Sequence, residues 1–194
     1  MAMHKEKQSA TELFWQIIDT AFQAGQFNND LKSELILDQL KELTPQQIID
    51  FEITLREKME EANTWENFAA QTIIEGGSSD DRFVYFRCWL ISIGKKNFYE
   101  TLKNQDYLAG IDIPINKKYH YGEVHFEELI YVSTKAYIFV TKNNNEDESF
   151  PRGIADKKGL NYDEDSDKMK GKEWENIKEL TQILPLLSKK YASN

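Results

Sequence analysis

The residue types best suited to chemistry lie in one block, which reads G-G-S-S-D-D-R-F-V-Y-F-R-C-W-L-I from Gly76 to Ile91. A glycine turn that opens a helix can hold an anion with free N–H groups, and an arginine such as Arg87 can bind a carboxylate or phosphate. The paired aspartates oppose an anion and favour a metal ion or a cationic group. The block therefore suggests a small-ligand or metal-dependent site. Its predicted lining is Trp65, Gly76, Gly77, Asp80, Asp81, Arg87 and Trp89.

The same block also fits a purely structural role. Gly76 and Gly77 can end one helix, because glycine tolerates the left-handed backbone found at helix C-termini. Ser78 or Ser79 can accept hydrogen bonds from the free N–H groups of the next helix. The two aspartates then stand where the dipole of that helix is positive. This capping interpretation explains every residue type in G-G-S-S-D-D, and we favour it.

The helix that follows is predicted to be buried on all sides. Between Phe83 and Ile93 only Arg87 and Ser92 are plainly polar, and a helix that is apolar all round belongs in a core. A buried guanidinium needs a partner, and an internal ion pair is the simplest one. The candidate carboxylates are Glu52, Glu66, Glu75, Asp80 and Asp81.

Two possible metal sites have the wrong spacing. Asp163-Glu-Asp165-Ser-Asp167 alternates carboxylates as a calcium loop does, but an EF-hand requires glycine and glutamate where this chain has Lys168 and Trp174. His120 and His125 are five residues apart, so they do not share a helical face as the i, i+4 zinc motif does. We expect neither a metal nor another cofactor.

Cys88 is the only cysteine, which excludes an intrachain disulfide and a cysteine-rich zinc site. Its mid-helix position among large apolar residues indicates a small buried hydrophobe rather than a nucleophile. The chain also has no phosphate-binding glycine loop, no nucleophile elbow and no serine–histidine pattern. The sequence therefore gives little evidence that the protein is an enzyme.

Composition limits the partners. The chain has 194 residues, enough for one domain with its own core, and 33 acidic against 24 basic residues give a net charge of -9. This balance argues against nucleic acid and anionic membranes, which attract lysine and arginine. The polar N-terminus and the lack of an apolar run of about 18 residues favour the cytoplasm.

The apolar periodicity predicts a mainly α fold, a compact single-domain helical array. Helix starts are indicated by a capping box at Ser9 and by Thr44-Pro45-Gln46-Gln47. Residues 123–141 fit helix or strand, and their length favours helix. Helices are expected near residues 10–25, 30–43, 45–62, 64–75, 80–93, 95–104, 129–140 and 174–184, with a final turn from Pro185.

Residues 143–170 differ from the rest of the chain. Acidic residues dominate, apolar ones are sparse, and asparagine, glycine and proline recur. This composition predicts an acidic, mobile surface loop before the last helix.

Several motifs together resemble a known family. They are F-W-x-x-I-D at Phe14–Asp19, L-T-P-Q-Q-I at Leu43–Ile48, the Gly76–Ile91 block, E-E-L-I-Y-V-S-T-K-A-Y at Glu127–Tyr137, and the closing L-P-L-L-S-K-K-Y. The chain is similar in these motifs to a bacterial family of uncharacterised domains, domain of unknown function 4240. That family usually ends in L-P-x-L-W, whereas this chain has Ser188 in place of the tryptophan. The resemblance implies no activity.

Two functions follow from these observations. The one we favour is a non-catalytic cytoplasmic module that binds another protein, for which a basic surface is the best electrostatic match. The alternative is a protein that binds a small ligand or a metal ion at the junction from Gly76 to Arg87, and such a protein could also be an enzyme.

Overall fold

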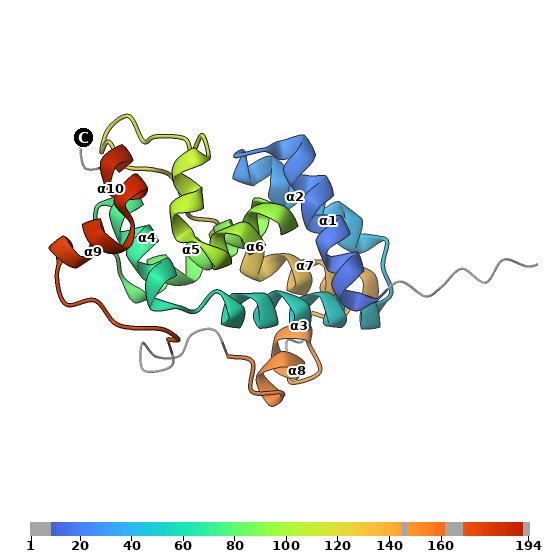
Figure 1. Cartoon of the computed structure of the whole chain (residues 1–194). Coiled ribbons are helices and arrows are strands. Elements are labelled where there is room, and N and C mark those ends of the chain that lie inside the picture. The colour runs from blue at the N-terminus through green and yellow to red at the C-terminus, as the bar shows by residue number, and fades with distance from the viewer. Residues whose placement is uncertain (1–8, 145–146, 162–168, 192–194) are drawn as a thin grey trace, which may run out of the picture.

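The structure is a computed structural model that describes residues 9–144, 147–161 and 169–191 (Figure 1). Within these ranges the fold is mainly α, as predicted, with no β-strands beyond two isolated bridges. The α-helices are α1 (Ala10–Gly25), α2 (Asn29–Lys41), α3 (Pro45–Glu61), α4 (Trp65–Glu75), α5 (Asp80–Ser92), α6 (Lys95–Lys103), α7 (Val132–Thr141), α8 (Pro151–Lys157), α9 (Ile177–Ile183) and α10 (Pro185–Tyr191). Two 3₁₀ helices, η1 (Gln105–Gly110) and η2 (Glu127–Tyr131), complete the set.

The predicted helix starts are confirmed by their caps. The Ser9 side chain accepts a hydrogen bond from the Glu12 backbone N–H at 3.2 Å, and the Glu12 carboxylate accepts one in return from the Ser9 N–H. Thr44 and Gln47 form the same reciprocal box at the start of α3, with Pro45 as the first helical residue. Local sequence alone therefore determines where these two long helices begin.

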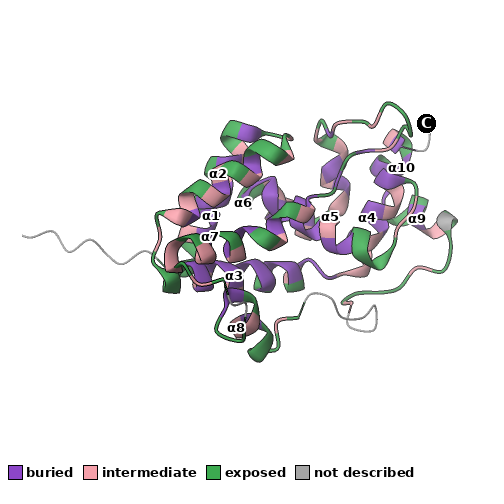
Figure 2. Ribbon diagram, turned by 180° about the vertical axis from the view of Figure 1, so that it is seen from behind, coloured by how far each residue is buried: buried purple, intermediate pink, exposed green. Residues whose placement is uncertain are grey.

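Helix α5 is the centre of the molecule. It packs against α1, α3, α4, α6 and η2, and Figure 1 shows it between the group formed by α1, α2, α3 and α7 and the group formed by α4, α9 and α10. Figure 2 shows the buried residues along the inner faces of the surrounding helices. Phe86, Cys88, Leu90 and Ile91 of α5 are fully buried, which confirms the predicted core helix.

The C-terminal third differs in part from the expectation. Residues 129–140 are helical, in η2 and α7, as predicted. The acidic segment, however, contains α8, which the sequence analysis did not predict. The apolar Phe150, Pro151 and Ala155 are buried as α8 packs on α3, so three apolar residues are enough to attach this segment to the core.

Helix α9 is shorter than expected, and α10 begins at Pro185 as predicted but is a seven-residue helix rather than a single turn. Helix α9 begins at Ile177 rather than near Trp174. The carboxylate of Asp106 in η1 accepts hydrogen bonds from the N–H groups of Leu186 and Leu187 at 3.1 and 3.0 Å. A side chain from 80 residues earlier therefore holds the start of α10.

A buried ion pair joins α3, α7 and α8. The Arg56 Nε donates to Glu52 Oε1 at 2.6 Å, and the Arg56 guanidinium also donates to Asp156 of α8 at 2.5 Å and to the Leu160 carbonyl. Ser133 of α7 donates to the second carboxylate oxygen of Glu52 at 2.5 Å. Because Glu52 and Arg56 are nearly inaccessible to solvent, each depends on the other to remain charged inside the protein.

We predict that Arg56→Met lowers the free energy of unfolding by about 3–5 kcal/mol, because it leaves the Glu52 carboxylate buried without its counter-charge. Urea denaturation measures the change. The control is Lys103→Met, which removes the exposed Lys103–Glu100 pair and should cost less than about 1 kcal/mol. Equal losses in the two variants would contradict the structural role of the buried pair.

A lysine is buried where α2 meets α5. Lys32 is fully inaccessible, and its Nζ donates to the Ser92 hydroxyl at 2.7 Å and lies 4.8 Å from the centre of the Phe126 ring. Gly25 of α1 makes room for it, because a Cβ at Gly25 would lie 2.8 Å from the Lys32 Cγ. Burial lowers the pKa of Lys32 to about 7.

This lysine makes stability depend on pH in a defined window. An unfolded lysine titrates near about 10.4. Between that pH and about 7 the unfolded chain therefore holds a proton that the folded chain lacks, so stability falls as the pH falls. We expect the free energy of unfolding of the wild type, relative to Lys32→Met, to drop by about 2–3 kcal/mol from pH 9 to pH 7. A difference that is constant over these pH values would show that Lys32 stays charged in the folded protein.

Candidate functional site

The junction between α4 and α5 has the capped geometry that the sequence predicted. Gly76 ends α4 in the left-handed conformation, with φ of 69°, and the N–H groups of Gly76 and Gly77 both donate to the Thr72 carbonyl. The Ser79 hydroxyl accepts a hydrogen bond from the Arg82 N–H at 3.4 Å and caps α5. Asp80 and Asp81 lie exposed in the first turn of α5.

Arg87 lies in the interior, as predicted, and is only 5% exposed. Its Nε donates to the Phe83 carbonyl at 3.4 Å, and its Nη1 donates to the Met59 carbonyl at 3.3 Å. The guanidinium carbon is 4.9 Å from the centre of the Phe83 ring, within range of a cation–π contact. The carboxylates of Glu52 and Glu75 bind elsewhere, to Arg56 and to Gln71.

The structure places the seven predicted site residues at several locations. Trp89 is 1% exposed and lies against Phe86 in the core, with ring centres 5.8 Å apart. Trp65 is half-buried at the start of α4, whereas Gly76 and Gly77 are at its other end. That these residues together bind a ligand stays a prediction, and the contacts at the junction are those of helix caps.

The other residues considered for metal binding or catalysis do not form a common site among the described residues. Among the described residues no group of three or more histidine, cysteine, aspartate or glutamate side chains could hold a metal ion. The acidic run from Asp163 to Asp167 lies outside the described residues. His120 and His125 are exposed, and burial raises the pKa of the Cys88 thiol to about 12, so this thiol is protonated near neutral pH.

An aromatic groove lies on the outer side of α4, where the segment before α9 crosses it. Lys170 pairs with the start of α4: its carbonyl accepts from the Trp65 N–H at 2.9 Å, and its N–H donates to the Asn63 carbonyl at 3.0 Å. The ring of Trp174 then stacks on that of Phe68, with centres 6.1 Å apart. The α4–α9 groove so formed encloses about 190 Å³ and is lined by Trp65, Glu66, Ala69, Lys172, Glu173, Trp174, Glu179 and Ile183.

Three carboxylates and one lysine surround the apolar surface of this groove. Glu179 accepts a hydrogen bond from the Glu175 N–H at 2.9 Å. Within the described part of the chain, Glu66 and Glu173 have neither an ion pair nor a hydrogen bond to their side chains, and Lys172 forms no ion pair. Glu66 is also held close to the backbone, since a Cβ at Gly171 (φ 91°) would overlap its carboxylate. The groove therefore combines indole rings with carboxylates that no cation among the described residues neutralises.

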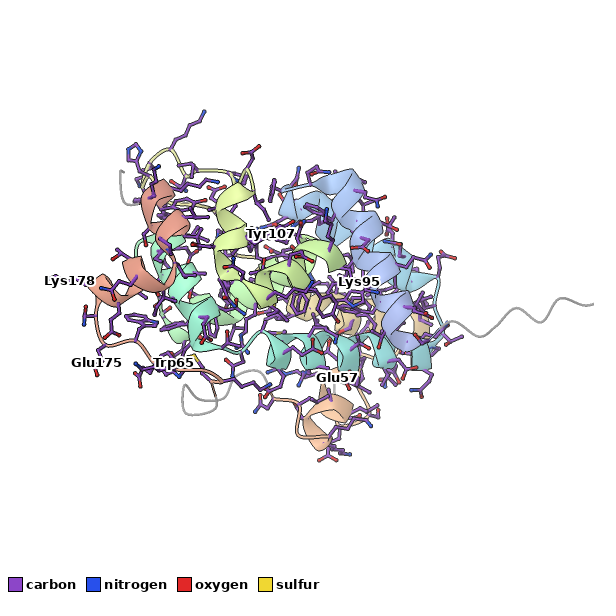
Figure 3. The ribbon with its side chains drawn as sticks, viewed as in Figure 1. Glu57, Trp65, Lys95, Tyr107, Glu175 and Lys178 are labelled. Atoms are coloured by element: carbon purple, nitrogen blue, oxygen red, sulfur yellow. The ribbon has the colours of Figure 1, made fainter. Side chains whose placement is uncertain are left out.

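Figure 3 shows how this region lies in the molecule. Trp65 at the start of α4, Glu175 in the segment before α9 and Lys178 in the first turn of α9 are on one side of the molecule, whereas Lys95 lies on α6 and Glu57 on α3. The groove is thus formed by two segments that are about a hundred residues apart in sequence.

Two further hollows have fewer polar groups available to bind a ligand. One, of about 240 Å³, lies between α4, α9 and α10 and includes Gly76, Ser188 and Tyr191. The hydroxyl oxygens of Ser188 and Tyr191 have no hydrogen-bond partner among the described residues, but both are closed to solvent. The other, of about 720 Å³, lies between the starts of α1 and α3, where Ser9 and Thr44 are already used as helix caps.

Sequence reasoning missed most of the groove and Lys32. Glu66 was considered only as a possible partner of Arg87, and the groove residues from Lys172 to Ile183 lie in a segment without a motif, so no local signal brought the groove residues together. Lys32 had a signal, because it precedes Ile36 and Leu40 at four-residue intervals and therefore lies on the buried face of α2. A lysine on such a face is a candidate for an unusual environment.

Comparison with known proteins assigns the chain to a family whose function is unknown. The family model described as "Protein of unknown function (DUF4240)" matches residues 10–138, which include all the elements from α1 to η2 and most of α7. No curated protein and no solved structure matches the chain. The match covers well over half of the 194 residues, and the chain therefore belongs to the DUF4240 family.

Proposed function

We propose that this protein is a non-catalytic helical module that binds another protein in the bacterial cytoplasm. The α4–α9 groove is the observation that carries the proposal. It exposes aromatic surface beside the carboxylates of Glu66 and Glu173, which the described residues leave unpaired. Aromatic residues are the most frequent anchors of protein interfaces, and unpaired charges at their rim select the partner.

The surroundings of the nucleophilic and titratable groups support a non-catalytic role. The Cys88 thiol is buried and protonated, and Lys32 is enclosed by side chains of the core. The exposed His120 and His125 lie in an irregular segment between η1 and η2, and no described serine or cysteine is hydrogen-bonded to them. A histidine that activates a serine or cysteine nucleophile needs that residue within hydrogen-bond reach.

Electrostatics favours a protein partner over a nucleic acid or a membrane. The net charge of -9 repels both the phosphate groups of a nucleic acid and the anionic head groups of a membrane. Among the described residues no helix is long and apolar enough to cross a bilayer. An acidic surface is best matched by a partner with a basic one.

A small-ligand site is the alternative, and the hollow between α4, α9 and α10 favours it. Gly76 borders this hollow, which is mostly apolar. The ligand would be a neutral molecule, because no charged side chain is among the described residues that line the wall. Binding there would raise the melting temperature in a thermal-shift screen of small neutral compounds.

The proposed function predicts a salt-sensitive protein complex. Immobilised protein incubated with lysate of its source organism at low salt should retain one partner in stoichiometric amount, identified by mass spectrometry. The partner should elute at high salt, because screening weakens contacts between exposed charges. The control is an unrelated acidic protein of the same net charge. Retention of the same proteins by both baits, or of no stoichiometric partner, would contradict the proposal.

A further inference from the structure

We propose that the α4–α9 groove docks a segment of the partner in which an arginine stands next to an apolar side chain. This inference rests on the proposed function and specifies its binding surface. It is carried by the combination in one place of indole rings, carboxylates that no described cation neutralises, and the exposed side chain of Ile183.

The floor of the groove accepts apolar groups. Trp65 and Trp174 both contact Phe68, Trp65 edge-on with ring centres 5.9 Å apart and Trp174 stacked. Phe68 in turn packs on the buried Phe83 of α5, so these rings are supported by the core. A rigid aromatic surface of this kind binds an apolar side chain at a low entropic cost.

Exposed aliphatic side chains follow Trp174 in the sequence. Ile183 at the end of α9 lines the groove and is 44% exposed. Leu186, three residues later at the start of α10, is 58% exposed. Both side chains are open to contact with an apolar residue of a partner.

The charge of the groove selects the residue beside the apolar one. The described residues that line the groove include three negative side chains (Glu66, Glu173 and Glu179) and one positive side chain (Lys172), which gives a local charge of -2. Like charges held together destabilise the free protein, and a cation from the partner relieves that repulsion.

Arginine fits better than lysine for a geometric reason. Its planar guanidinium can lie flat on the indole of Trp65 and also donate two parallel hydrogen bonds to a carboxylate such as Glu66. Trp65 and Glu66 are adjacent at the start of α4, and both line the groove. Lysine offers a point charge without the flat surface, so it should bind more weakly at this position.

The inference is tested with peptide arrays. The probes are random 12-residue peptides with a fixed central Arg-Leu pair, and the matched array has Gln-Leu at the centre. We expect the wild-type protein to bind the Arg-Leu array at least tenfold more strongly at low salt. The preference should disappear in the Glu66→Gln/Glu173→Gln double variant, and the Trp65→Ala variant should lose binding to both arrays.

The control variant removes the same charge from a different surface. Glu34 of α2 and Glu57 of α3 are exposed, and Glu34→Gln/Glu57→Gln should keep the preference for Arg-Leu. Equal binding of the two arrays by the wild type, or equal loss of preference in both double variants, would overturn the inference. Thermal melting confirms that each variant is folded.

The lysate experiment separates failure of the inference from failure of the proposed function. If Glu66→Gln/Glu173→Gln still captures the partner, the protein binds through another surface, and only the docking site proposed here is wrong. If the wild type captures no partner, the proposed function itself fails.

Discussion

The burial of α5 from Phe83 to Ser92 is the constraint on which the rest of the structure depends. After its exposed first turn this helix needs apolar neighbours all round, and α1, α3, α4, α6 and η2 provide them. Its polar residues must be satisfied internally, as Ser92 is by Lys32 and by the Trp89 carbonyl. The ends of α4 and α5 are closed locally at the Gly76–Asp81 motif, where Gly76 ends α4 and the Ser79 hydroxyl caps α5.

This constraint also explains where a functional surface can lie. The inner face of α4 belongs to the core, so only its outer face can offer side chains to a partner. That face is covered in part by α9, α10 and the segment that pairs with Trp65, all of which follow the last residue matched by the family model. The groove therefore combines a helix from the matched region with a C-terminal segment outside it. Its chemistry depends on this chain's own C-terminal residues.

The sequence predicted the elements well where the signal was local. Capping boxes at Ser9 and Thr44 and the glycines after α4 determined helix ends, and uninterrupted apolar residues identified α5 as the core helix. The prediction missed α8, because the acidic composition of residues 143–170 concealed a short apolar patch. It also could not find the groove, since contacts between Trp174 and Phe68 or between Asp106 and α10 depend on tertiary structure. Periodicity finds helices, but it does not pair segments that are distant in sequence.

The way charge is distributed gives the strongest reason to regard the groove as functional. Where burial is nearly complete, the fold gives its acids partners: Glu52 pairs with Arg56 on the same helix, Glu75 accepts a hydrogen bond from Gln71, and Asp106 accepts two from backbone N–H groups. On exposed helices it uses neighbours such as Glu100 and Lys103, whose contribution is small. The partly buried Glu66 follows neither pattern: it lies against the backbone of Gly171, beside two indole rings, and no described cation contacts it. The dipole of α4 favours Glu66 as a first-turn acid, but no described cation neutralises it, and a basic partner would gain both a charge pair and an apolar contact there.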